Sequence, residues 1–150
     1  MNIVLVEPKM PANTGNIIRL CANTNTQLHL VGPLPFNLDD QKLRRAGLDY
    51  REWANVKVYD NWTDFNPQHP LIGCSTRATK RYTSQIFTPH DWLVFGSEDE
   101  GISHLIRQDP HWEEWIRIPM HPQSRSLNLA NSVSIIVFEA LRQQGFQGLQ

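Results

Sequence analysis

Residues 3–31 read IVLVEPKMPANTGNIIRLCANTNTQLHLV and decide how the chain begins to fold. The apolar run at residues 3–6 stops at a glutamate and a proline, which is typical of a buried strand that leads into a loop. Asn13 or Thr14 can cap a helix after this loop. The apolar residues of that helix recur at helical spacing: Ile17, Ile18, Cys21 and Ala22. Residues 28–31 predict a second strand, so the chain begins strand, helix, strand.

The rest of the chain repeats this alternation. Further strands are predicted at residues 56–59, 71–74, 92–95 and 115–118. Helical segments are predicted at residues 39–46, 62–65, 103–108 and 127–142. Strands that alternate with helices indicate an α/β fold, with a mostly parallel sheet and helices on both faces. No linker or repeat interrupts the pattern, so we expect a single domain over residues 1–150.

Composition narrows the class of protein. The chain has 150 residues, 40% of them hydrophobic and 19% charged, which describes a compact domain. A net charge of −1 disfavours a protein that coats nucleic acid indiscriminately but leaves specific RNA binding open. Cys21 and Cys74 show no paired spacing and follow no apolar signal, so we expect free thiols and a cytoplasmic location. No apolar stretch approaches the roughly 20 residues that cross a bilayer, so we expect no membrane partner.

Positive charge is concentrated in two tracts with a tyrosine near each. The tracts contain Lys42, Arg44, Arg45 and Arg51, and then Arg77, Lys80 and Arg81, with Tyr50 and Tyr82 close by. Basic and aromatic side chains together suit phosphates and bases. The alternative is that both tracts are solvated loops.

The loops after the strands are the candidate sites, because an open parallel sheet binds ligands beyond the carboxyl ends of its strands. The loop after residues 3–6 has neither G-x-G-x-x-G nor a phosphate loop, which disfavours nicotinamide and nucleoside-triphosphate enzymes. Residues 96–101, GSEDEG, place glycines around acids, which suits either close approach of a ligand or a solvated loop. Residues 119–131 supply more polar side chains than one helix cap needs, which favours ligand contacts.

Other chemistries lack support in the sequence. The histidines do not have a common metal-ligand spacing, so we expect no metal. Glu98, Asp99 and Glu100 are adjacent, whereas a glycosidase needs carboxylates that face each other across the substrate. Cys21 lies on the apolar stripe of its helix, where a thiol fills core volume.

The last helix has two apolar stripes. The main stripe contains Leu129, Val133, Ile136, Val137, Ala140 and Leu141. Ile135 and Phe138 form a second stripe, and a helix that is apolar on two sides is buried on two sides. The second side could be covered by the core itself or by a partner subunit, and of the two we expect a homodimer.

Three segments together resemble the three motifs of the SpoU-type branch of the SPOUT methyltransferases: residues 13–19, 93–102 and 116–131. Residues 16–24, 43–50 and 117–128 are similar to the small single-domain enzymes that methylate the ribose at the tRNA wobble position. The resemblance covers nearly the whole chain. Two segments depart from it: GSEDEG stands where GPETRG is usual, and Asn25 stands where glycine is usual.

The resemblance implies a C-terminal trefoil knot, an S-adenosylmethionine pocket with S-adenosylhomocysteine as product, and a homodimer that completes the active site. The implied cofactor residues lie in three loops: Cys74, Ser75, Gly96, Ser97, Glu98, Gly101, Ile118, Pro119, Met120, Ser126 and Leu127. On this interpretation the substrate is tRNA and the reaction is 2′-O-methylation of its wobble nucleotide.

Four residues are assigned to the reaction as a hypothesis: Arg19, Glu98, Ser126 and Asn128. Arg19 would clamp the phosphate beside the target ribose, because a guanidinium stays protonated and makes a poor base. Ser126 and Asn128 would orient ribose and cofactor. The expected RNA contacts are Asn16, Arg19, Lys42, Arg44, Arg45, Tyr50, Arg51, Arg77 and Arg125.

Three alternatives remain open from sequence alone. The first is the same chemistry on another tRNA or rRNA nucleotide. Glu100 keeps this alternative open, because the similar enzymes usually have an arginine at that position. The second is an RNA-binding module without catalysis, and the third is a small-molecule methyltransferase.

Overall fold

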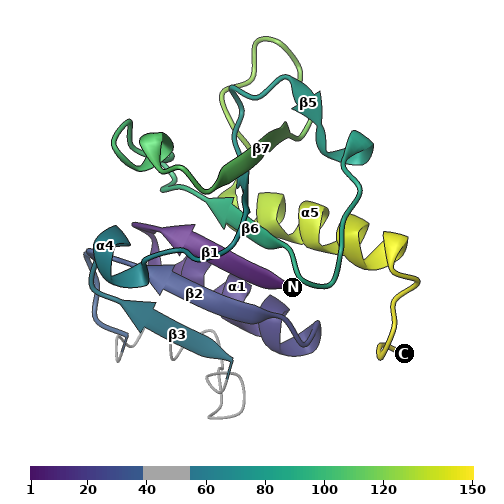
Figure 1. The fold of residues 1–150 in the computed structure, drawn as a ribbon, viewed down its shortest axis with the longest axis horizontal. Helices are drawn as coiled ribbons and strands as arrows, with labels where there is room; N and C mark the ends of the chain where they lie inside the picture. Colours follow the sequence, from purple (N-terminus) through teal and green to yellow (C-terminus); the bar gives the residue numbers. More distant parts are fainter. Residues whose placement is uncertain (39–54) are drawn as a thin grey trace.

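The computed structural model describes residues 1–38 and 55–150, which form an α/β fold around one sheet (Figure 1). The strands are β1 (Asn2–Val6), β2 (Gln27–Val31), β3 (Val56–Tyr59), β4 (Leu71–Cys74), β5 (Lys80–Arg81), β6 (Trp92–Phe95) and β7 (Trp112–Arg117). The helices are α1 (Pro11–Asn23), α4 (Trp62–Phe65) and α5 (Leu129–Gln143), with 3₁₀ turns η1 (Tyr82–Ser84) and η2 (Ile106–Gln108). The predicted segment 39–46 lies outside the described residues.

The sheet has seven strands in the order β3-β2-β1-β6-β4-β7-β5. Every pairing between these named strands is parallel, which confirms the predicted parallel sheet. β6 lies between β1 and β4, although it follows both in the chain. The carboxyl ends of β1, β4, β6 and β7 therefore meet at one edge of the sheet.

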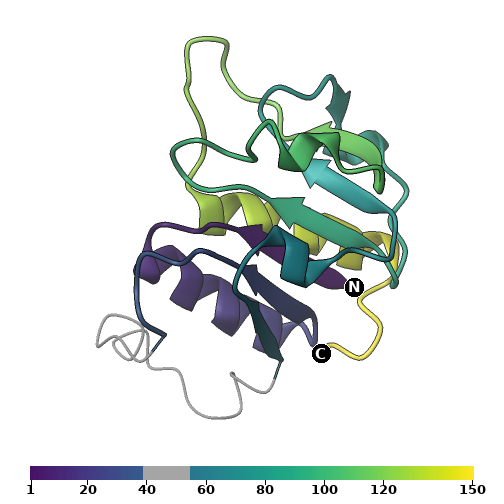
Figure 2. The ribbon, with the colours of Figure 1, turned by 60° about the vertical axis from the view of Figure 1, so that its left-hand side comes forward.

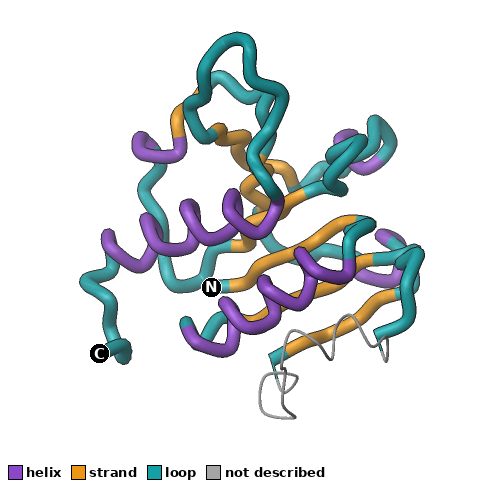
Figure 3. Tube along the Cα trace, turned by 180° about the vertical axis from the view of Figure 1, so that it is seen from behind, coloured by secondary structure: helices purple, strands orange, loops and turns teal. Residues whose placement is uncertain are grey.

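The two faces of the sheet are covered differently, as Figures 2 and 3 show. Alternate strand residues such as Ile3, Leu5 and Leu93 are fully buried under α1 and α5, which also pack against each other. The strand residues between them, such as Val4 and Val94, face the other side of the sheet. They are buried beneath α4, η2 and a group of aromatic side chains. The prediction of helices on both faces is therefore met by long helices on one face and short ones on the other.

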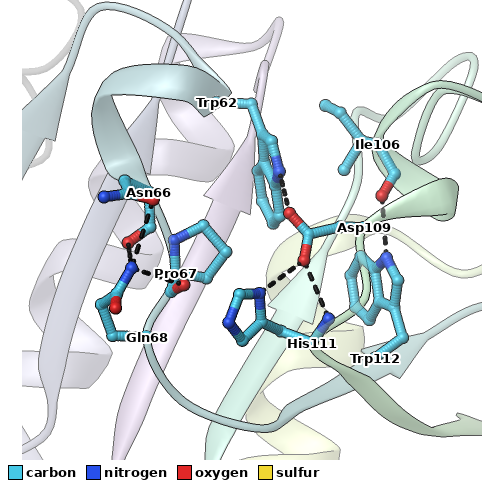
Figure 4. A network of polar contacts seen from close by, with 8 residues as sticks. All are labelled: Trp62, Asn66, Pro67, Gln68, Ile106, Asp109, His111 and Trp112. Atoms are coloured by element: carbon cyan, nitrogen blue, oxygen red, sulfur yellow. Dashed lines mark hydrogen bonds and ion pairs between the residues drawn. The ribbon is translucent and has the colours of Figure 1, made fainter.

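A polar network fastens η2 over the second face (Figure 4). The Asp109 carboxylate accepts hydrogen bonds from Trp62 Nε1 at 2.8 Å and from the His111 backbone N at 2.9 Å. Burial alone would raise the pKa of Asp109, but these donors, joined by the His111 ring, offset it and lower the pKa. Trp112 Nε1 donates to the Ile106 carbonyl at 2.8 Å, which fixes η2 to β7.

Several predicted helix boundaries are wrong. Neither Asn13 nor Thr14 caps α1, because the helix begins at Pro11 with Met10 as N-cap, and both residues are buried inside it. The last helix begins at Leu129 and not at residue 127, because Asn128 takes the N-cap position. Within the predicted helix 103–108 only η2 is helical, since Asp109 and Pro110 end the segment after a single turn.

Strand predictions are wrong in two places. β7 runs from Trp112 to Arg117, whereas residues 115–118 were predicted, because Leu71 and His111 extend its pairing with β4 towards the amino end. The two-residue β5 was not predicted, since so short a strand leaves no sequence pattern. Asn25, which replaces a usual glycine, has φ of 50°, a left-handed conformation that asparagine tolerates.

Predictions about thiols and membranes were also testable. Cys21 and Cys74 are both free, as predicted, and burial raises the pKa of the Cys21 thiol to about 11. Over residues 1–38 and 55–150, no helix has the length and apolar character that crossing a bilayer requires.

Candidate functional site

A cavity of about 540 Å³ opens at the carboxyl ends of β4, β6 and β7. Three loops line it: the one after Cys74, residues 96–102, and residues 118–127. Every cofactor residue predicted from sequence lines this cavity except Pro119, whose side chain is exposed. The arrangement follows the rule that parallel sheets bind ligands beyond the carboxyl ends of their strands.

The glycines of the 96–101 loop are required by the backbone. A Cβ on Gly96 would lie 2.1 Å from the carbonyl carbon of Gly101, so no side chain fits there. Ser97 and Gly101 exchange backbone hydrogen bonds of 3.2 and 3.1 Å, which closes the loop into a tight turn. Gly101 has φ of 71°, a conformation that favours glycine. The 96–101 loop that lines the cavity therefore has a backbone conformation fixed by its glycines and by its own hydrogen bonds.

The Glu98 carboxylate joins this loop to the start of α1. It accepts hydrogen bonds from the backbone N of Lys9 at 2.8 Å and of Met10 at 3.2 Å, and from Asn13 Nδ2 at 2.9 Å. Met10 makes no side-chain cap, so Glu98 supplies the acceptor that the helix N-terminus lacks locally. The negative charge of Glu98 also interacts favourably with the positive N-terminal end of the α1 dipole.

Asn128 extends the same network to the last helix. Its Nδ2 donates to Asn13 Oδ1 at 2.9 Å, and its Oδ1 accepts from the Asn131 backbone N at 3.2 Å as the N-cap of α5. Glu98, Asn13 and Asn128 thus connect the three sequence segments that carry the resemblance. Because the polar atoms of Glu98 and Asn128 are already engaged within the protein, both residues are suited to positioning the loops.

Arg107 is a cavity residue that sequence reasoning missed. Its guanidinium reaches the cavity from η2, donating from Nε to the Ile102 carbonyl at 3.0 Å and from Nη2 to Ser75 Oγ at 3.2 Å. No motif marks Arg107, because the residue approaches the cavity only through the packing of η2 on the sheet.

Other predicted residues are distributed unevenly. Arg77 and Arg125 line the cavity, whereas Asn16 and Arg19 are exposed on α1 and do not line it. Five predicted RNA contacts lie outside the described residues: Lys42, Arg44, Arg45, Tyr50 and Arg51.

Charged side chains of both signs line the cavity beside apolar ones. Burial raises the pKa of the Cys74 thiol, so this side chain contributes a neutral surface. The acidic lining residues are Glu98, Asp99 and Glu100, and the basic lining residues are Arg77, Arg107 and Arg125. A hydrogen bond from Ser97 is the main cause that lowers the pKa of Asp99. In the part of the chain that the structure describes, no three histidine, cysteine or acidic side chains are grouped to hold a metal ion.

Comparison with known proteins identifies the family. The sequence profile of the SpoU rRNA methylase family matches residues 1–138, which is most of the chain. A Burkholderia pseudomallei (strain 1106a) protein named tRNA (cytidine(34)-2′-O)-methyltransferase is 48% identical over 153 residues, covering 98% of this chain and 97% of its own. A Saccharophagus degradans (strain 2-40) protein of the same name is 50% identical over 150 residues, with the same coverage of 98% and 97%.

A solved structure agrees with these sequence matches. It is described as giving structural insights into the 2-OH methylation of C/U34 on tRNA, and it superimposes with a TM-score of 0.86 at 32% identity. The superposition covers 97% of each chain, so the two proteins share nearly the whole fold.

Proposed function

The chain belongs to the SpoU rRNA methylase family, and we propose that it transfers a methyl group from S-adenosylmethionine to the ribose 2′-hydroxyl of the wobble nucleotide, position 34, of tRNA. The main support for this proposal is sequence similarity to proteins named for this activity. The similarity extends over 98% of the chain at 48–50% identity. The cavity lies within the matched residues, and its loops contain the three segments that resemble the family motifs.

The cavity fits S-adenosylmethionine in size and chemistry. Its volume of about 540 Å³ lies in the range of small-molecule sites. Ile118, Met120 and Leu127 offer apolar surfaces for an adenine ring. When bound, the cofactor supplies an electrophilic methyl group. The protein then has to hold the 2′-oxygen in line with that group.

On the acceptor side we assign a clamp to Arg19. The guanidinium stays protonated and would grip the phosphate beside the target ribose through two hydrogen bonds, and that phosphate or a nearby group would accept the hydroxyl proton. Ser126, exposed at the cavity mouth, would orient the ribose or the cofactor. Glu98 and Asn128 act by positioning, because Glu98 receives three donors and Asn128 caps α5.

Arg19 lies on exposed α1 surface, outside the cavity lining, which supports a homodimer in which one copy completes the site of the other. Phe138 of α5 is 48% exposed, and Ile135 is half-buried on the same helix, so α5 offers an apolar surface for that contact. A C-terminal trefoil knot is proposed as well. Its support is that Gln143 of α5 donates to Gln85 O and accepts from Phe87 N at 2.9 Å each, which holds the last helix against the β5–β6 connection.

RNA contacts are proposed in the cavity lining and on α1. Arg77 and Arg125 line the cavity, and Asn16 is exposed on α1 beside Arg19. The basic tract of residues 42–51 is included in the proposal from its sequence. Because the net charge is only −1, specific contacts would dominate, and binding would still weaken as salt rises. A tRNA substrate also implies the cytoplasm as the site of action.

The test is methyl incorporation from labelled S-adenosylmethionine into total tRNA, followed by nuclease mapping of the labelled nucleotide. Label on a 2′-O-methyl nucleotide at position 34 is the expected result, while label at another nucleotide, or on rRNA, would overturn the proposed target. Absence of both label and cofactor binding would overturn the enzyme assignment.

A matched pair of variants tests the clamp. Arg19→Ala should lower kcat/KM for tRNA by about a hundredfold, because the acceptor is misplaced. Arg142→Ala removes another exposed helical arginine, one that pairs with Glu139, and should retain most activity. Full activity of the Arg19 variant would refute the assignment.

A further inference from the structure

Arg107 is held in place by contacts with three different segments of the chain. Ile102 O and Ser75 Oγ accept hydrogen bonds from its Nε and Nη2 at 3.0 and 3.2 Å, and its guanidinium carbon lies 4.5 Å from the centroid of the Trp115 ring. Ile102 follows the loop after β6, Ser75 follows β4, and Trp115 lies in β7. A guanidinium fixed in this way loses little conformational freedom when it binds a ligand.

The support beneath Arg107 is itself rigid. A Cβ on Gly73 of β4 would lie 2.3 Å from the Trp115 ring, so the ring is packed directly on the strand backbone. Trp112 and Trp115 are packed with centroids 4.4 Å apart. The position of Arg107 therefore follows from the aromatic packing on this face and not from the loop alone.

Arg107, which lines the cavity, retains unused donors. A guanidinium has five N–H groups, and the two hydrogen bonds described above use two of them. Arg77 lines the same cavity, and among residues 1–38 and 55–150 neither arginine takes part in an ion pair. Burial, followed by repulsion from Arg77, lowers the pKa of Arg107. A bound anion would favour the charged guanidinium and so offset both effects.

We propose that Arg107, assisted by Arg77, binds the carboxylate at the amino-acid end of the cofactor, an inference that rests on the proposed function. The carboxylate is the one anionic group of S-adenosylmethionine, and its two oxygens match a guanidinium fork. Arg107 is half-buried in the cavity wall, whereas Arg77 and Arg125 are exposed. A cofactor carboxylate inside the cavity reaches Arg107 more directly than an RNA phosphate at the mouth does.

The experiment compares two ligands that differ in the amino-acid end. Titration calorimetry would measure the Kd of S-adenosylhomocysteine and of 5′-methylthioadenosine, which lacks the carboxylate, for the wild type, Arg107→Met and Arg107→Lys. Arg107→Met should weaken S-adenosylhomocysteine binding about tenfold or more and leave 5′-methylthioadenosine nearly unchanged. Arg107→Lys keeps the charge but loses the two-pronged guanidinium, so its Kd for S-adenosylhomocysteine should lie between those of the wild type and Arg107→Met. Lys57→Met, which removes an exposed cation of β3 away from the cavity, should change neither Kd.

The outcomes separate this inference from the proposed function. Equal weakening of both ligands would overturn it, since Arg107 would then only support the cavity. An unchanged Kd for S-adenosylhomocysteine with a raised KM for tRNA would overturn it in favour of an RNA phosphate. If the wild type bound neither ligand, the proposed function would fail together with the inference. Retained 5′-methylthioadenosine binding by the variant shows that its cavity is folded.

Discussion

Replacement of Glu98 by glutamine tests whether the cavity loop and α1 are joined by charge. The carboxylate accepts from Lys9 N, Met10 N and Asn13 Nδ2 at 2.8, 3.2 and 2.9 Å, at a helix N-terminus without a local cap. A glutamine amide keeps one acceptor oxygen and turns an NH₂ group towards donors. The loss of a charge-assisted hydrogen bond and of the charge–dipole attraction should cost about 2–3 kcal/mol of unfolding free energy.

The assay is thermal and urea-induced unfolding at fixed protein concentration, since association would shift the midpoint. For a chain of this size the expected loss lowers Tm by roughly 4–12 °C. Glu113→Gln is the matched control, because this exposed acid lies on β7, which β6 and β4 separate from β1, and it should change stability by less than about 0.5 kcal/mol. If Glu98→Gln were as stable as Glu113→Gln, the network would not carry the stability assigned to it.

Three further predictions concern other positions. His29 is 2% exposed, and burial, followed by the charge of Lys57, lowers its pKa from 6.5 to about 4, so its stabilising contribution is complete above pH 6.5 and is lost as pH falls towards 4. Urea unfolding should show wild type losing about 2–3 kcal/mol more than His29→Gln between pH 7 and pH 4.5, and equal losses would contradict this. Gly96→Ala should abolish measurable S-adenosylhomocysteine binding, because its Cβ meets Gly101; calorimetry showing wild-type affinity would disprove the tight turn. Asn128→Ala should lower unfolding stability by about 1–2 kcal/mol through loss of the α5 cap and the Asn13 bond, and no change in the urea midpoint would argue against both contacts.

Much of the fold was predictable because its signals are local. Residues 3–6, 71–74 and 92–95 are apolar runs buried from both sides, as central parallel strands must be, and each lies in the predicted place. The spacing of Leu129, Val133 and Ile136 likewise predicted the buried stripe of α5. These features depend on neighbours along the chain, so a sequence pattern can identify them.

The errors occurred where a distant residue replaced a local signal. Asn13 was predicted as a helix cap, yet its Nδ2 donates to Glu98, 85 residues away, and Asn13 Oδ1 accepts from Asn128. For the site, the three loops were predicted from motif resemblance, and the cavity brings them together. Arg107 was missed because its approach depends on the packing of η2 and Trp115.

The sequence by itself determined most of the strands, the long helices and the parallel α/β class, because burial patterns and turn residues act over a few positions. Its motifs also indicated the loops that line the cavity. Only the tertiary structure decided that β6 lies between β1 and β4, that Glu98 caps α1, and that Arg107 faces the cavity. Those features arise from pairing and packing between segments far apart in the chain, where no local pattern indicates which partners will meet.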